Sequence, residues 1–163
     1  MEKTLILPVR WNPATTKPAL GDSPAVKLLT NGIRGSLKYS DSEWCSWTDN
    51  DSVSFTIDLL KPETLNTLTL GCITNNGMAI HKPSSVKVEV SGDNSSFCEA
   101  AMRSFTPEEI FREGNFIENL PLKLRGTQAR YVRVTAKGPG VCPASHVRPG
   151  QVSRILFDEM ILE

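Results

Sequence analysis

The feature that most constrains the fold is a series of short runs in which apolar and polar residues alternate. Val132 and Val134 alternate with Arg133 and Thr135, which is the two-residue period of a half-buried strand. Further strand-like runs, alternating or continuously apolar, occupy residues 4–9, 53–59, 65–71, 86–90, 116–120 and 155–162. Clusters of Gly, Pro, Asn and Ser separate these runs and are typical of turns.

Helix signals are confined to two short segments. Thr106 can act as an N-cap, Pro107 suits the first helical position, and Gly114 ends the helix after about two turns. A second short helix is expected over Pro24–Leu29, with Ser23 as its cap. Many short strands with almost no helix predict an all-β chain folded as an antiparallel β-sandwich.

Size and charge narrow the classes of function. The 163 residues predict a single domain, with residues 1–23 as its N-terminal strand and leader and residues 24–163 as the sandwich. Eighteen basic residues balance eighteen acidic ones, which argues against a nucleic-acid or anionic-membrane footprint. No apolar run approaches the roughly 20 residues of a membrane span.

The N-terminus and the cysteines bear on location. The N-terminus lacks the apolar core of a signal peptide, so the chain is either cytoplasmic or a fragment of a longer chain with Met1 added, and we favour the fragment. The spacing of Cys45, Cys72, Cys98 and Cys142 matches no metal-binding pattern of the CxxC type. We expect four free, mostly buried thiols, with one disulfide as the alternative.

Seven motifs together resemble a known family. In chain order they are Leu29–Gly35, Trp44, Phe55–Leu59, Ile80–Pro83, Val86–Ser91, Ala129–Val134 and Asp158–Leu162. This series resembles the discoidin, or coagulation factor 5/8 type C, fold over about residues 24–163. More narrowly, it resembles the family 32 carbohydrate-binding modules appended to glycoside hydrolases of gut Bacteroidetes. The resemblance implies a galactose-binding-domain-like jelly-roll sandwich that binds sugar in loops at one end and is not catalytic.

The resemblance also implies a structural calcium ion near the first loop. Family members supply an Asp-Gly pair and a Glu near the C-terminus, and the matching positions here are Asn31–Gly32 and Glu159. Calcium prefers several charged or carbonyl oxygens. Because Asn31 replaces a carboxylate, we expect a weaker or empty site, and the alternative for Glu159 is a surface carboxylate at a strand end. No other cofactor is expected.

The ligand loops of the resembling modules correspond to Tyr39–Asp51, Thr74–Lys82 and Gly138–Ser153. Sugars are held by an aromatic face and by planar polar groups that bond hydroxyls. The candidate ligand-binding residues in these loops are Tyr39, Trp44, Trp47, Asn75, Asn76, His81, His146 and Arg148.

Each candidate has a structural alternative. One or both tryptophans can plug the end of the sandwich, and Asn75–Gly77 is also what a tight turn prefers. His81 can simply cap the turn before Pro83. In the third loop, many resembling modules read Cys-Pro-Asp-Trp-His-Pro-Gly, whereas Ser145 occupies the position of the Trp. Losing that stacking platform costs about 1–3 kcal/mol by analogy with other aromatic anchors.

The sequence offers little to build an enzyme. It contains only two histidines and no nucleophile motif. Asp158 and Glu159 could act as acid and nucleophile, but neighbouring residues of a regular strand point to opposite faces. We therefore expect no catalysis.

The favoured interpretation is a module that tethers a larger glycan-degrading protein to its substrate. The expected partner is a galactose-type or N-acetylhexosamine-type glycan, with a hydrolase covalently joined in the full-length protein. The expected location is secreted, periplasmic or cell-surface, with a cytoplasmic location as the alternative. A protein-interaction module and a purely architectural module remain the other two hypotheses.

Overall fold

The computed structural model describes residues 10–11, 29–47 and 52–163. Its elements are β1 (Arg10–Trp11), β2 (Cys45–Trp47), β3 (Ser52–Asn75), the 3-10 turn η2 (Asn76–Met78), β4 (Ser85–Ser91), β5 (Cys98–Ser104), α1 (Pro107–Ile110), β6 (Asn115–Lys137) and β7 (Ile155–Leu162). The all-β prediction is confirmed. The strand expected at Thr4–Val9, the leader and nearly all of the helix expected at Pro24–Leu29 lie outside the described residues.

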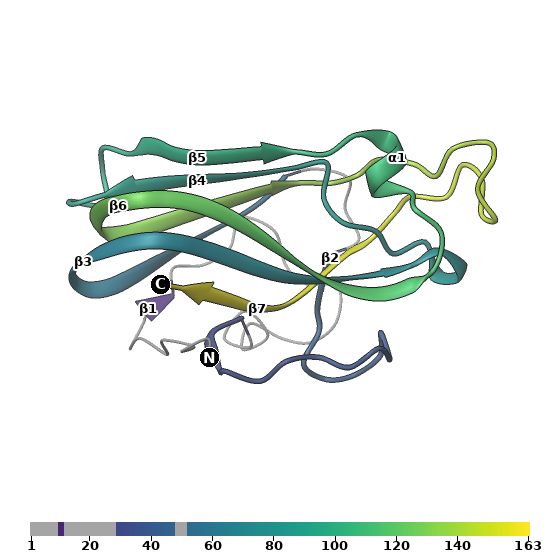
Figure 1. The fold of residues 1–163 in the computed structure, drawn as a ribbon, viewed down its shortest axis with the longest axis horizontal. Helices are drawn as coiled ribbons and strands as arrows, with labels where there is room; N and C mark the ends of the chain where they lie inside the picture. Colours follow the sequence, from purple (N-terminus) through teal and green to yellow (C-terminus); the bar gives the residue numbers. More distant parts are fainter. Residues whose placement is uncertain (1–9, 12–28, 48–51) are drawn as a thin grey trace.

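Two very long strands, β3 and β6, form the centre of the sheet. They pair antiparallel from Ser52 opposite Lys137 to Asn75 opposite Asn115. The sequence predicts two separate strands in the place of β3, with a break at Pro62. The chain instead bends there, with a register shift after Asp58, and continues as one curved strand (Figure 1).

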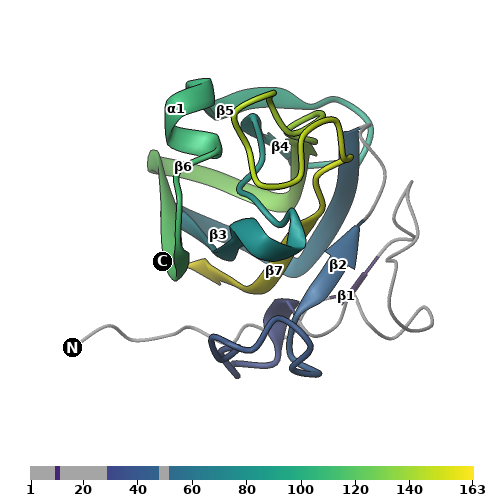
Figure 2. The ribbon, with the colours of Figure 1, turned by 90° about the vertical axis from the view of Figure 1, so that its right-hand side faces the viewer.

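The strands are arranged in the order β2-β7-β3-β6-β4-β5, and β1 pairs with β3. Because β3 and β6 curve along their length, the two ends of this sheet lie face to face as the layers of a sandwich (Figures 1 and 2). Between the layers lie fully buried side chains such as Trp47, Phe55 and Phe157. Across the described residues, no helix is long and apolar enough to cross a bilayer.

Strand β7 contains a bulge that the sequence does not reveal. Leu70 pairs with Met160 and Cys72 pairs with Phe157, so Asp158 and Glu159 together oppose one β3 residue. An extra residue of this kind redirects side chains, and both carboxylates contact the same loop: Asp158 accepts from an amide at residue 35 and Glu159 from amides at residues 32 and 33. The prediction that they point to opposite faces is therefore wrong.

The loops that could hold a ligand gather at one end of the sandwich. Helix α1, η2 and the loop of residues 138–154 lie together at the right of Figure 1 and face the viewer in Figure 2. The predicted cap of α1 is confirmed, because the Thr106 side chain accepts from the Glu109 amide at 3.3 Å and the Glu109 carboxylate accepts from the Thr106 amide at 2.7 Å. The helix is shorter than expected.

Candidate functional site

Two histidines far apart in sequence meet at the loop end of the sandwich. His81 Nε2 and His146 Nε2 are 3.0 Å apart, and their rings are edge-to-face. His81 follows η2 and is fully buried, whereas His146 lies in the long loop and is half-buried. Burial, helped by the neighbouring His146, lowers the pKa of His81 to about 4. His81 is therefore neutral near pH 7.

A small recess of about 90 Å³ opens beside His146. Its lining residues are Asn76, Phe111, Glu113, Pro143, Ser145, His146 and Val147. Phe111, at the C-terminal end of α1, packs edge-on against both imidazole rings, with centroids 5.0 Å from His81 and 6.2 Å from His146. The recess thus combines an aromatic ring, an amide, an imidazole and a carboxylate.

Hydrogen bonds fix the protonation of this cluster. The Arg148 amide donates to His146 Nδ1 at 2.9 Å, so in the neutral ring the proton lies on Nε2. That proton can be donated to His81 Nε2. The Asn76 amide nitrogen lies 3.3 Å from His146 Nε2, while Asn76 Oδ1 accepts from the Gly114 amide. Since two donors cannot bond each other, the Asn76 N–H groups are left for solvent or a ligand oxygen.

The same hydrogen bonds decide against a preformed transition-metal site. The ligand atoms of His81, Cys142 and His146 lie within 4.8 Å of one another, a donor set that suits zinc. A metal on His146 Nε2 requires the ring proton on Nδ1, which already accepts from the Arg148 amide. The imidazole pair is therefore arranged as donor and acceptor.

Arg148 and Tyr39 flank the loop end in different ways. The Arg148 side chain donates from Nε to the Gly77 carbonyl and from Nη1 to Gln151 Oε1 at 3.4 Å, which ties the long loop to η2. Tyr39 is half-buried and packs against a small apolar cluster, with the Arg154 guanidinium 5.8 Å from its ring. Arg148 thus belongs to the recess region, and none of these Tyr39 contacts involves the two histidines.

Burial removes three predicted residues from contact with a ligand. Trp44 is 2% exposed and Trp47 is fully buried against Phe55 and Phe157. His81 is fully buried as well. The prediction that these side chains touch a sugar is wrong, because none offers a ring face or an edge to solvent. Residues 48–51 of that first loop lie outside the described residues.

Asn75 has the structural role of a turn residue, which was the alternative to binding a ligand. Asn75 exchanges backbone hydrogen bonds with Ile80, at 2.9 and 3.1 Å, and so closes the turn that contains η2. Sequence reasoning missed Phe111 and Glu113. The only signal for them was an aromatic and an acid between the end of a short helix and Gly114.

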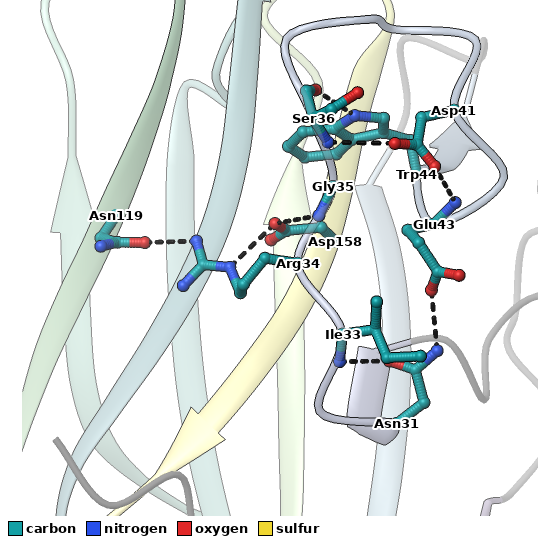
Figure 3. Close-up of polar contacts among 10 residues, drawn as sticks. All are labelled: Asn31, Ile33, Arg34, Gly35, Ser36, Asp41, Glu43, Trp44, Asn119 and Asp158. Atoms are coloured by element: carbon teal, nitrogen blue, oxygen red, sulfur yellow. Dashed lines mark hydrogen bonds and ion pairs between the residues drawn. The ribbon is translucent and has the colours of Figure 1, made fainter.

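The two residues predicted to hold calcium meet at the first loop: Asn31 belongs to that loop, and Glu159 of β7 accepts from its Gly32 and Ile33 amides. Glu159 is 1% exposed, and its Oε2 has no hydrogen-bond partner. Burial raises the pKa of Glu159 to about 7, although hydrogen bonds from the Gly32 and Ile33 amides act to lower it. Asn31 Oδ1 accepts from the Ile33 amide at 2.9 Å, and its Nδ2 donates to Glu43 Oε2 at 2.8 Å (Figure 3). An unpartnered buried carboxylate oxygen is a ligand of the kind that a hard cation prefers.

The four cysteines are free thiols, as expected, and three of them are buried. Burial raises the pKa of Cys45 and of Cys72 to about 12. These thiols are therefore protonated at neutral pH and have little nucleophilic character.

The described residues form a β-sandwich whose end loops enclose a polar, aromatic-edged recess. A family model matches the chain: the F5/8 type C domain covers residues 20–148. The chain belongs to the F5/8 type C domain family. No curated protein matches the chain.

Solved structures share the fold at low identity. The C-terminal domain of a Bacteroides fragilis chitobiase is 17% identical, with a TM-score of 0.57 over 95% of this chain and 92% of that one. The Clostridium perfringens module CpGH89CBM32-5, in complex with GalNAc-β-1,3-galactose, is 16% identical, with a TM-score of 0.58 over 94% of both chains. The family 32 carbohydrate-binding module of Streptococcus pneumoniae EndoD is 11% identical, with a TM-score of 0.63 over 99% of both.

Proposed function

We propose that this chain is a non-catalytic carbohydrate-binding module whose sugar site is the recess at the loop end. The observation that carries the proposal is the convergence of Asn76, Phe111 and His146 from three separate segments onto one small recess. Amide N–H groups with no protein acceptor can bond a sugar oxygen, and an aromatic ring can cover the C–H face of the sugar. Carbohydrate-binding modules among the structural neighbours support this choice.

The proposed site differs from the one expected from the sequence. Phe111 takes the place of the aromatic that is missing at Ser145, and it approaches from α1 rather than from the long loop. Arg148 acts at the rim, where its exposed guanidinium can bond hydroxyls while Nε holds the loop. The recess is smaller than the roughly 300–1,000 Å³ typical of drug-sized ligands, so it suits one substituent or one edge of a sugar, with the rest lying outside.

The chemistry of the site favours binding over reaction. His81 accepts from His146, and Asp158 and Glu159 are held by Arg34 and by backbone amides. None of these groups is paired with a nucleophile. We therefore propose no turnover, and we propose that the module acts by tethering a larger, extracellular glycan-degrading protein to its substrate.

The burial of the two tryptophans does not support the alternative hypothesis of a protein-interaction module. An exposed apolar patch around Trp44 and Trp47 would favour that hypothesis, but both rings are buried.

A binding site for calcium on Asn31 and Glu159 is part of the proposal. The ion would neutralise the buried carboxylate and stiffen the first loop.

Calorimetric titration with galactose, N-acetylgalactosamine and mucin-type glycans tests the proposal. We expect binding by the wild-type chain, and we expect Phe111→Leu and Arg148→Ala to weaken it by about 1–3 kcal/mol each, the range for an anchor side chain. Val141→Thr is the matched control, because Val141 is exposed in the same loop but does not line the recess. A folded wild-type protein that binds none of these sugars would overturn the proposal.

A further inference from the structure

A second concave surface lies between β5 and the first half of β6, away from the loop end. We name it the edge groove, and it has a volume of about 410 Å³. It is lined by Ala100, Ala101, Met102 and Arg103 of β5 and by Pro121, Leu122, Lys123 and Arg125 of β6. Strand β5 is the last in the sheet order, and the first half of β6 pairs with β3 alone among the described residues. Within that part of the chain, two strand edges without a further partner border the groove.

The register explains why the groove is open. Ala101 pairs with Val88 and Arg103 pairs with Val86, and residues that pair directly across two strands share a face of the sheet. Since both valines are fully buried, Ala101 and Arg103 lie on the inner face at its margin. The small alanine leaves space, and Arg103 Nη1 reaches across to the Pro121 carbonyl at 3.4 Å.

All the charged residues that line the edge groove are cationic. Its lining contains three cations, Arg103, Lys123 and Arg125, and no acidic residue, although the whole chain has a formal net charge of zero. None of the ion pairs found among the described residues involves these three side chains. Unneutralised cations beside free backbone edges attract an anionic ligand.

The lining also selects the class of ligand. Protein partners are anchored by aromatic residues, and single-stranded nucleic acids and neutral sugars stack on them, but no aromatic residue lines the edge groove. Charge must therefore supply the affinity, which requires an anionic ligand. A volume of about 410 Å³ lies within the usual range for small-ligand sites. We propose that the edge groove binds an anionic glycan, one that carries sulfate or carboxylate groups, independently of the recess.

Protection of the sheet edge is the competing explanation for these residues. Inward-facing charges, lysine and proline at an edge prevent pairing with another chain. Glutamate in place of the cations keeps that protection but repels an anion. Charge reversal therefore separates the two explanations.

The test is titration of the intact chain with a chondroitin sulfate tetrasaccharide and with a hyaluronan tetrasaccharide. The salt concentration is about 50 mM, because the Debye length then exceeds 10 Å and charges are only weakly screened. Binding of both glycans indicates that carboxylates suffice, and binding of only the first indicates that sulfate is required. We expect binding that weakens several-fold at about 300 mM salt. No binding of either glycan would overturn the proposal.

Variants locate the site. The triple variant Arg103→Glu, Lys123→Glu, Arg125→Glu should bind the anionic glycan at least about tenfold more weakly, since each lost charge contact carries part of the affinity. The control variant Lys38→Glu, Arg112→Glu, Lys137→Glu changes the net charge equally outside the edge groove and should retain binding. Phe111→Leu should also retain it, even if neutral sugars fail to bind at the recess. Equal loss in both triple variants would contradict the proposed site.

Discussion

Arg34 Nε donates to Asp158 Oδ2 over 2.9 Å, although the two residues are 124 positions apart in the chain. The Asp158 side chain is completely buried, while 38% of the Arg34 side chain is exposed. The Gly35 amide donates to the same carboxylate oxygen, and Arg34 Nη2 donates to Asn119 Oδ1 at 2.6 Å (Figure 3). This pair ties the first loop to β7 and neutralises a charge inside the sandwich.

Removing Arg34 should destabilise the protein more than removing an exposed partner. Arg34→Ala leaves Asp158 buried with only a backbone donor, and we expect a loss of about 2 kcal/mol, below the ~3–5 for fully buried pairs because water reaches Arg34. Lys61→Ala, which breaks the exposed pair with Glu63, should cost less than about 1 kcal/mol. Urea unfolding measures both losses, and equal values would contradict this account.

Gly71 should tolerate no side chain. A Cβ there would lie 1.9 Å from Asp158 Oδ1 and 2.5 Å from Arg34 Nη2, so the ion pair would have to move. We expect Gly71→Ala to reduce the free energy of unfolding by at least about 2 kcal/mol. Gly92→Ala is the control, because nothing lies within 4 Å of its Cβ position. Thermal melts of the two variants measure this difference. Equal Tm values would show that β7 moves to make room for the added methyl group.

Trp47 should act through stability rather than through binding. Its ring stacks on Phe55, with centroids 6.5 Å apart, and Trp47→Ala should cost about 3–5 kcal/mol through the cavity left behind. Ile33→Ala, at a side chain that is 52% exposed, should change stability by less than about 0.5 kcal/mol. Sugar affinity of the folded fraction should be unchanged in both, and a selective loss of affinity in Trp47→Ala would return this residue to the binding site.

His81 should make the fold less stable in acid. Its pKa falls from an ordinary 6.5 to about 4 on folding, so the unfolded chain binds the extra proton. The stability that depends on neutral His81 is complete above about pH 6.5 and is lost as the pH falls toward 4. From pH 7.5 to 4.5, wild type should lose about 2–3 kcal/mol relative to His81→Gln.

Denaturant unfolding of both proteins at the two pH values measures that difference. Glu159 acts in the opposite sense, because its pKa is raised to about 7 and its protonation favours the folded state. This contribution is common to both proteins and cancels. A pH-independent difference would show that His81 does not titrate as inferred.

Calcium should stabilise the chain through Glu159. A cation that binds only the folded state adds about 2.7 kcal/mol at 100 times its dissociation constant, so calcium should raise Tm relative to a chelator. Glu159→Gln should abolish the shift, and Asn31→Asp should enlarge it by restoring a charge. Glu108→Gln, at an exposed acid in α1, is the control. The same shift in Glu159→Gln would place the ion elsewhere.

Local patterns in the sequence predicted most of the strands but not how they join. Alternation identified the first half of β3 and the second half of β6, and shorter apolar runs indicated the other two halves. The bend near Pro62 keeps the strand continuous by shifting the register after Asp58, which depends on pairing with β6. Strand β5 escaped notice because residues 98–104 are exposed or only partly buried, so they carry no apolar period.

The site was harder to predict because it depends on contacts distant in sequence. His146, Arg148 and Asn76 were predicted, and the structure brings them together. Trp44 could not be assigned from its loop alone: its Nε1 donates to the Ser36 carbonyl at 2.8 Å, and its ring fills the space where Gly35 lacks a Cβ. Phe111 reaches the histidines only through the path of α1 across the sandwich end.

The pairing of Ser52 with Lys137 has a kinetic consequence. Every contact of the β3–β6 ribbon joins residues that are far apart in the chain, so a large loop must close before any of its hydrogen bonds can form. We expect slow folding, in milliseconds to seconds rather than microseconds. During synthesis, the exposed apolar face of β3 must wait for β6 to emerge, and it is then most open to capture by a chaperone or by another nascent chain.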